Sequence, residues 1–296
     1  MKQVEERYIS LLTDFGFKRI FGTAMNKDLL ICFLNSLFNG RQVVKDVSYL
    51  NPEHVGDVYT DRKAIFDVYC EGENGEKFIV EMQNAYQAYF KDRSLFYSTF
   101  PIREQAPKGN DWDFKLNHVY TVALLNFNMN EDAFDKEKIR HHVQLCDTAT
   151  HKIFYDKLEF IYVEIAKFNK TLEELETLYE KWLYALKNLY KLTQRPKELC
   201  DKVFDRLFEE AEIAKFTPQE MREYEASKMA YRDIKNCIDT AKQEGLAEGI
   251  ELGRKICMEL GMNQKALDIV RNMLADGVDI NLIMKYAGLT QEQIEK

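Results

Sequence analysis

The stretch Asp67–Gln83 reads DVYCEGENGEKFIVEMQ, and its pattern decides how the surrounding chain folds. Two short runs rich in β-branched and aromatic residues flank GENG, which is a turn signal, so the stretch predicts a β-hairpin. Apolar residues fall on both alternating faces of each run. We therefore expect a hairpin that is covered on both sides and lies near the centre of a sheet.

Side-chain alternation assigns each hairpin residue to one of two faces. On the second strand, one face carries Phe78, Val80 and Met82, and the other carries Ile79, Glu81 and Gln83. On the first strand, the same rule groups Phe66 with Val68 and Cys70, and Ile65 with Asp67 and Tyr69. Two carboxylates, Asp67 and Glu81, thus lie on otherwise apolar strands.

An ionised carboxylate in such a place is costly unless a cation or hydrogen-bond donors offset its charge, and two facing carboxylates repel each other. A divalent metal ion would resolve this conflict, and hard oxygen ligands suit Mg²⁺. The turn decides whether the two groups meet. A two-residue Asn74-Gly75 turn would place Asp67 opposite Met82, whereas a three-residue loop with a left-handed Gly75 places Asp67 opposite Glu81. We expect the three-residue loop, or a bulge with the same effect.

Helical and strand-like patterns alternate on either side of the hairpin. Helical spacing over residues 27–38 and 86–105 predicts two helices, and Asp67–Gln83 is preceded by the strand-like QVVKDVSYL. HVYTVALLNF and KLEFIYVEIAKF predict two more strands with a His-rich loop between them. The sequence therefore predicts an α/β fold, with a mixed central sheet flanked by helices, over residues 1–170.

Beyond residue 171 the pattern is helical throughout, with Pro196 and Pro218 as expected interruptions. We expect a helical extension packed on the core over residues 171–240 and a small helical module over residues 241–296. Gly245, Gly249 and Gly253 are spaced to permit a close helix contact. A helix-turn-helix reader is conceivable in the terminal module, but basic residues are few there, so we favour an interaction or homodimerisation module.

Composition narrows the class of protein. The 296 residues carry a net charge of −8, with 15 basic and 17 acidic residues in positions 1–130, so a polyanion site belongs in the nearly neutral first part. No apolar run approaches a membrane span, and the acidic start MKQVEERY does not resemble a signal peptide. Six dispersed cysteines favour reduced, packing thiols. We expect a cytoplasmic protein that does not contact membranes.

An aspartate, thirteen residues and then ExQ, formed by Asp67, Glu81 and Gln83, resembles the active-site signature of the PD-(D/E)XK nuclease superfamily, with Gln83 in the position of the usual lysine. Further stretches resemble the recombination-promoting nuclease and transposase family within it. They are LLTDFGFKRIFG, NKDLLICFLNSLF, KFIVEMQ and YFKDRSLFYS, together with AEGIELGRK and AGLTQEQIEK near the C-terminus. The resemblance implies a restriction-endonuclease-like fold.

The resemblance also implies roles for particular residues. Asp67 and Glu81 would be metal ligands, with the Met82 carbonyl as a third, and a metal-activated water would attack a DNA phosphodiester while Mg²⁺ polarises the phosphate. Gln83 would orient the water or a phosphate oxygen by hydrogen bonds, although it lacks the positive charge of lysine.

Other residues are secondary candidates. Arg93 and Tyr97 could contact a DNA phosphate and stack nearby, or simply form the charged edge of an amphipathic helix. Lys18 belongs to the family-like N-terminal motif and is a candidate DNA contact. Asp14 could be an accessory carboxylate, but we favour it as the N-cap of a helix starting at Phe15. His142, Cys146 and His151 have zinc-like residue types, but their irregular spacing disfavours a zinc site.

The leading hypothesis is a Mg²⁺-dependent DNA endonuclease associated with mobile elements or recombination. The alternative is a catalytically weak module of the same fold that binds nucleic acid or protein, which the Gln83 departure and the net charge keep open. A third class is a helical assembly protein that acts through its C-terminal region.

Overall fold

The computed structural model describes residues 6–54, 64–106, 113–129 and 133–287. Its contacts divide the chain into two compact units, Met1–Lys235 and Asn236–Lys296. The three-part division at residues 170 and 240 stays a prediction. Among the described residues, no helix is both long enough and apolar enough to cross a membrane.

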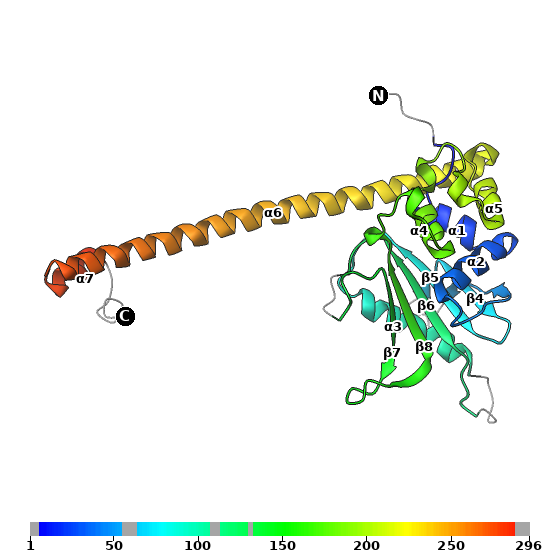
Figure 1. The fold of residues 1–296 in the computed structure, drawn as a ribbon, viewed down its shortest axis with the longest axis horizontal. Coiled ribbons are helices and arrows are strands. Elements are labelled where there is room, and N and C mark those ends of the chain that lie inside the picture. Colours follow the sequence, from blue (N-terminus) through cyan, green and yellow to red (C-terminus); the bar gives the residue numbers. More distant parts are fainter. Residues whose placement is uncertain (1–5, 55–63, 107–112, 130–132, 288–296) are drawn as a thin grey trace. The chain divides into compact units, whose positions relative to one another are not determined.

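A six-stranded sheet forms the centre of the first unit, in the order β1-β4-β5-β6-β8-β7 (Figure 1). β5, β6 and β8 are parallel neighbours, and the other pairings are antiparallel, which confirms the mixed sheet. The strands are β1 (Val47–Tyr49), β4 (Val68–Gly72), β5 (Lys77–Gln83), β6 (Val119–Leu125), β7 (Arg140–Cys146) and β8 (Ile153–Glu164). A separate two-stranded sheet joins β2 (Glu53–His54) to β3 (Ala64–Ile65).

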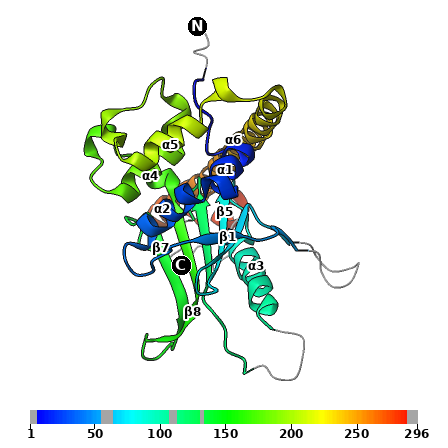
Figure 2. The same ribbon diagram turned by 90° about the vertical axis from the view of Figure 1, so that its right-hand side faces the viewer.

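Helices cover both faces of the six-stranded sheet, so the predicted fold class is confirmed (Figure 2). One face packs against α1 (Asp14–Phe21), α2 (Lys27–Phe38), α4 (Leu178–Asn188) and α5 (Lys202–Glu210). α3 (Phe90–Glu104) covers the other face. Trp182, fully buried, contacts the rings of Phe21, Phe33 and Phe204 in the larger core. Short 3-10 helices occur at Ala24–Asn26, Ile165–Lys167, Leu172–Glu174, Leu189–Lys191, Lys197–Leu199 and Ile213–Lys215.

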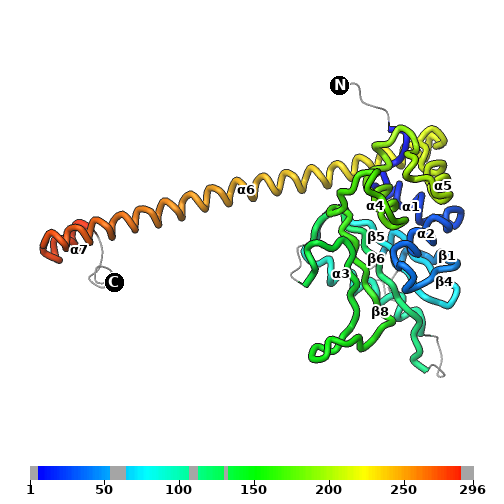
Figure 3. The backbone as a smooth tube through the Cα atoms, in the orientation of Figure 1, coloured from blue at the N-terminus to red at the C-terminus, as the bar shows by residue number. Residues whose placement is uncertain are grey.

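α3 connects the parallel strands β5 and β6, as Figure 3 traces. Parallel neighbours need such a crossover because the chain must return to the same end of the sheet. The helix predicted over residues 86–105 begins at Phe90 in the structure, with Tyr89 as its N-cap residue. The helix predicted over residues 27–38 is confirmed, and it ends at the left-handed Asn39.

The hairpin register is the one that the three-residue loop predicts. Val68 pairs with Val80 and Tyr69 with Ile79, and Gly75 has a φ of 82°, which is the left-handed conformation. The loop closes where the Gly72 N–H donates to the Glu76 carbonyl over 2.8 Å. A three-residue loop that ends in a left-handed residue is a common hairpin connection, and glycine adopts that conformation without steric cost.

The first hairpin strand is not continuous, which corrects one face assignment. The chain bends at Phe66 and Asp67, between β3 and β4. The Phe66 N–H donates to the Pro52 carbonyl, and the Phe66 side chain packs with Tyr69 and Ile79 instead of with Val68. The bend breaks the period-2 alternation, so the expected grouping of Phe66 with Val68 and Cys70 was wrong.

The His-rich segment also differs from expectation, because it forms strand β7 and not a loop. β7 lies at the edge of the sheet, and most of its residues are exposed or half-buried. An edge strand with little burial does not require alternating apolar residues, so the polar sequence RHHVQLC carried no strand signal.

The C-terminal region contains α6 (Pro218–Ala275) and α7 (Ile280–Ala287). Pro218 starts α6, as its fixed φ and missing N–H allow. α6 continues to Ala275, and a short connection at residues 276–279 separates it from α7. α6 ends in a Schellman motif, with Val278 N–H donating to the Met273 carbonyl and Gly277 left-handed. No described atom lies within 4 Å of an added Cβ at Gly245, Gly249 or Gly253, so the expected close helix contact does not form within the described chain.

Candidate active site

Asp67 and Glu81 meet at the bend that precedes β4. The Asp67 N–H donates to Glu81 Oε1 over 3.3 Å, and the Met82 N–H donates to Asp67 Oδ2 over 2.8 Å. Each carboxylate therefore accepts from a backbone amide of the opposite strand, in place of the carbonyl that a regular ladder would supply. The bend thus holds both carboxylates at the same point between the strands.

Burial sets the electrostatics of this pair. Glu81 is only 6% exposed, and burial together with the nearby charge of Asp67 raises the pKa of Glu81 to about 8. Burial also raises the pKa of Asp67, although the Met82 N–H and the Lys18 ammonium oppose that shift. Removing charged groups from water and placing two like charges together both favour the protonated form. The pair accordingly favours any cation that can offset its charge.

Gln83 and Met82 follow Glu81 on β5, and each occupies the position that the hairpin pattern predicts. Gln83 Nε2 donates to Glu81 Oε2 over 3.3 Å, which confirms that Gln83 shares a face with Glu81. The Met82 N–H points toward Asp67, and in a strand the N–H and C=O of one residue point to the same edge. The Met82 carbonyl is therefore directed to the edge of β5 that carries Asp67.

Lys18 reaches the carboxylate pair from α1. Its Nζ lies 2.6 Å from Asp14 Oδ1 and 3.8 Å from Asp67 Oδ1, so it bridges two carboxylates. The expected N-cap role of Asp14 was wrong, because Thr13 is the N-cap and its Oγ1 accepts from the Gly16 N–H at 3.1 Å. Asp14 is instead the first residue of α1, where it is mostly exposed and positions Lys18.

Arg93 and Tyr97 approach from α3 on the opposite side. The charge of Arg93 lowers the pKa of both Asp67 and Glu81. Burial, and to a smaller extent the charge of Glu81, raises the pKa of Tyr97. The Arg93 guanidinium lies over the rings of Phe90 and Tyr97, 5.2 and 5.6 Å from their centroids. Its Nη1 donates to Gln87 Oε1 over 2.6 Å. Gln87 was not predicted as part of the site, since only its contact with Arg93 marks it.

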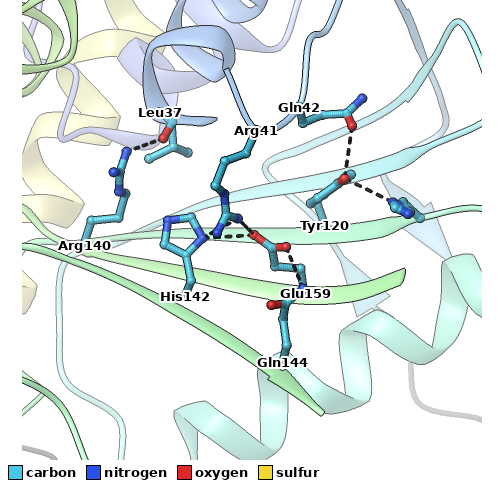
Figure 4. A network of polar contacts seen from close by, with 9 residues as sticks. Leu37, Arg41, Gln42, Tyr120, Arg140, His142, Gln144 and Glu159 are labelled. Carbon is cyan, nitrogen blue, oxygen red and sulfur yellow. Dashed lines mark hydrogen bonds and ion pairs between the residues drawn. The ribbon is translucent and has the colours of Figure 1, made fainter. Parts of the chain in front are cut away.

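His142, one of the zinc-type residues, takes part in a different network (Figure 4). Its Nδ1 lies 2.9 Å from Glu159 Oε1 and 2.8 Å from Arg41 Nη2, and Gln144 Nε2 donates to Glu159 Oε2. Burial alone would raise the pKa of Glu159, but the hydrogen bond with His142 and the charge of Arg41 hold it below its ordinary value. This network joins the end of α2 to β7 and β8, so it serves packing.

Within the described ranges, no group of three or more His, Cys, Asp or Glu side chains is placed to hold a metal ion. The half-buried Asp67 and the buried Glu81 nevertheless fit a hard divalent cation, because two ionised carboxylates there repel each other and burial raises the pKa of both. Mg²⁺ commonly binds through one or two carboxylates and keeps several waters. A two-carboxylate site with a neighbouring carbonyl therefore matches its requirements.

A family model described as PD-(D/E)XK nuclease family transposase matches residues 11–241, well over half of the chain. A second model, described as the C-terminal HTH domain of the Rpn/YhgA-like nuclease family, matches residues 263–296. The second match corrects the preference for an interaction module there, although a homodimer through this region stays a prediction. Searches of the curated proteins and of the solved structures find no significant match.

Proposed function

The chain belongs to the transposases of the PD-(D/E)XK nuclease family, and we propose that it is a metal-dependent DNA endonuclease that cuts phosphodiester bonds by hydrolysis. The observation that carries this proposal is the pairing of the half-buried Asp67 with the buried Glu81 at the hairpin bend, within reach of Lys18. The helix-turn-helix match in residues 263–296 supports DNA as the partner. An association with mobile elements or recombination, and a cytoplasmic location, are part of the same proposal.

The residues divide the work by chemistry. Asp67, Glu81 and the Met82 carbonyl would hold Mg²⁺, which when bound would activate water and polarise the phosphate. Gln83 donates a neutral hydrogen bond and cannot supply the charge of a lysine. Lys18 extends from α1 and places its ammonium near Asp67. In this proposal the ammonium contacts the DNA backbone and stabilises the negative charge that develops on the phosphate during hydrolysis. Arg93 binds a phosphate as a charge-assisted donor.

The alternative is a catalytically weak module that binds DNA without cutting it, and the glutamine at position 83 supports it. Calorimetric titration of Mg²⁺ or Mn²⁺ into the wild type and Asp67→Ala tests the metal site, and nicking of plasmid DNA separates the two functions. We expect metal binding that Asp67→Ala abolishes, together with nicking of plasmid DNA that is lost in both Asp67→Ala and Glu81→Ala. Nicking that survives both substitutions would show that the chemistry lies elsewhere. Metal binding without nicking would favour the weak module.

A further inference from the structure

A groove of about 640 Å³ follows the first turns of α3. We call it the aromatic groove, and its lining includes Tyr89, Asp92, Arg93, Phe96 and Tyr97. Tyr89, Arg93 and Phe96 are separated by four and three positions, so they follow one side of the helix. The volume lies in the range of roughly 300–1,000 Å³ that is usual for small-molecule pockets.

The rings along this groove are unusually exposed for aromatic side chains. Tyr89 is 79% exposed and Phe96 is 42% exposed, and Tyr86, 55% exposed, precedes them in the sequence. Single exposed apolar residues need no explanation, but several large rings around an arginine indicate a surface that binds something.

The aromatic groove shares a wall with the carboxylate pair. Tyr97 lines the groove and packs edge-on against Phe66, the residue before Asp67, with ring centroids 5.2 Å apart. Arg93 also lines it, and its charge reaches both Asp67 and Glu81. Among the described residues, the buried Arg93 Nη2 has no hydrogen-bond partner, so the protein alone leaves this donor unsatisfied.

The charges of the lining decide which part of a nucleotide fits. The exposed carboxylate of Asp92 repels a phosphate but tolerates a neutral base. Arg93, between the groove and the carboxylate pair, attracts the phosphate. Base and phosphate of one nucleotide thus have complementary partners on the two sides of Arg93.

We infer that the aromatic groove binds an unpaired nucleobase of the DNA whose phosphate lies at the Asp67–Glu81 pair, and this inference rests on the proposed function. In an intact duplex, neighbouring bases cover both ring faces, so only an unpaired or extruded base can stack on Tyr89 or Phe96. Stacking on tyrosine or phenylalanine tolerates every base because each has a π-face. The substrate class is therefore DNA with unpaired nucleotides, such as bulges or single-stranded segments.

The test measures stacking directly, with the full chain carrying Asp67→Asn so that bound DNA stays intact. The probe is a duplex with one bulged 2-aminopurine, compared with the same duplex carrying an abasic bulge and with a fully paired duplex. We expect quenching of the bulged base and binding tighter than to the abasic bulge by on the order of tenfold. Tyr89→Ala should lose both effects, and Tyr89→Phe should keep them. Quenching is local to the bulge, so DNA contacts of residues 263–296 do not produce it.

Phe154→Ala is the matched control, because the Phe154 ring is 82% exposed, as the Tyr89 ring nearly is, but lies far from the carboxylate pair. Phe154 is near the start of β8. The part of β8 that is level with Glu81 is near its other end, where Tyr162 pairs with Ala123 and Ala123 pairs with Glu81. Phe154→Ala should leave quenching and affinity unchanged. Equal binding to all three DNAs, or a loss in Tyr89→Ala that is as large for the paired duplex, would overturn the inference. Metal-dependent cleavage by the wild type with no preference for the bulge would overturn the inference about the groove and would leave the proposed endonuclease function intact. Quenching without any cleavage overturns the endonuclease and keeps the groove.

Discussion

The two carboxylates of the candidate site are held by amides of the opposite strand, and this arrangement concentrates negative charge in a buried place. Burial, together with the nearby charge of Asp67, raises the pKa of Glu81 from its ordinary value of 4.5 to about 8. The folded state therefore binds more protons than the unfolded state between these values. Raising the pH through this interval destabilises the metal-free protein.

Glu81→Gln should remove this penalty while keeping an oxygen that accepts from the Asp67 N–H. Without divalent metal, we expect the variant to be more stable than the wild type by about 1–3 kcal/mol above pH 8, the usual cost of an uncompensated buried polar group. The difference should vanish as the pH falls well below 4.5, because Glu81 is then protonated in both the folded and the unfolded state. Urea unfolding in a chelating buffer, at several pH values, measures it. Glu137→Gln removes an exposed carboxylate and is the control, with an expected change below ~0.5 kcal/mol. A gain that is constant with pH would contradict the assignment of the shift to Glu81.

In the proposed mechanism, the neutral amide of Gln83 gives the attacking water or the phosphate one hydrogen bond, whose removal costs about 0.5–1.5 kcal/mol. Gln83→Ala should therefore slow cleavage about tenfold, far less than loss of Asp67. Gln83→Lys adds a charge-assisted contact to the phosphate and should keep or raise the rate. Single-turnover cleavage at saturating Mg²⁺ compares the three proteins. A Gln83→Ala enzyme as inactive as Asp67→Ala would mean that Gln83 does more than orient.

Among the secondary-structure elements, the β4–β5 hairpin is the one that brings the carboxylates together. Its register depends on the left-handed Gly75, at which an added Cβ would lie 2.4 Å from Asn117 Nδ2. A change of one residue in the loop would turn Glu81 to the other face of the sheet. The turn thus determines whether the site exists.

Gly75→Ala should destabilise the protein by ~1–2 kcal/mol through its left-handed backbone, with a further cost for moving Asn117. Gly40→Ala is the matched control, since Gly40 has nearly the same φ of 83° but open space around it. Thermal unfolding of both variants separates the cost of the left-handed backbone from the cost of the contact with Asn117. Plasmid nicking, assayed below the unfolding temperatures of both variants, tests whether the carboxylate pair is still in place. We expect only Gly75→Ala to lose nicking. Equal nicking by the two variants would show that the loop does not control the pair.

At the scale of the whole molecule, all three hydrophobic core clusters of the first unit lie within residues 8–231. A chain ending at residue 241 keeps these clusters and the whole nuclease-family match, and it loses the helix-turn-helix match. We expect it to fold, to nick plasmid DNA with metal, and to bind DNA more weakly with a smaller salt dependence, since Lys and Arg contacts with phosphate are removed. Affinity measured at two salt concentrations tests this. Unchanged affinity and salt slope would exclude residues 242–296 from DNA binding.

The hairpin, its register and the pairing of Asp67 with Glu81 could be predicted from the sequence, because side-chain alternation and a Gly-containing loop are local rules. The same rules also predicted the face of Gln83 and the two-sided cover of the sheet. They missed the strand β7 and the bend at Phe66, since an edge strand lacks an apolar pattern and a bend depends on bonding to Pro52. The contacts of Lys18 with Asp14 and Asp67, and the position of Arg93 and Tyr97 beside the same site, became visible only in the folded chain. These contacts join α1, the hairpin and α3, and the packing of separate elements is set by long-range burial that no local spacing records.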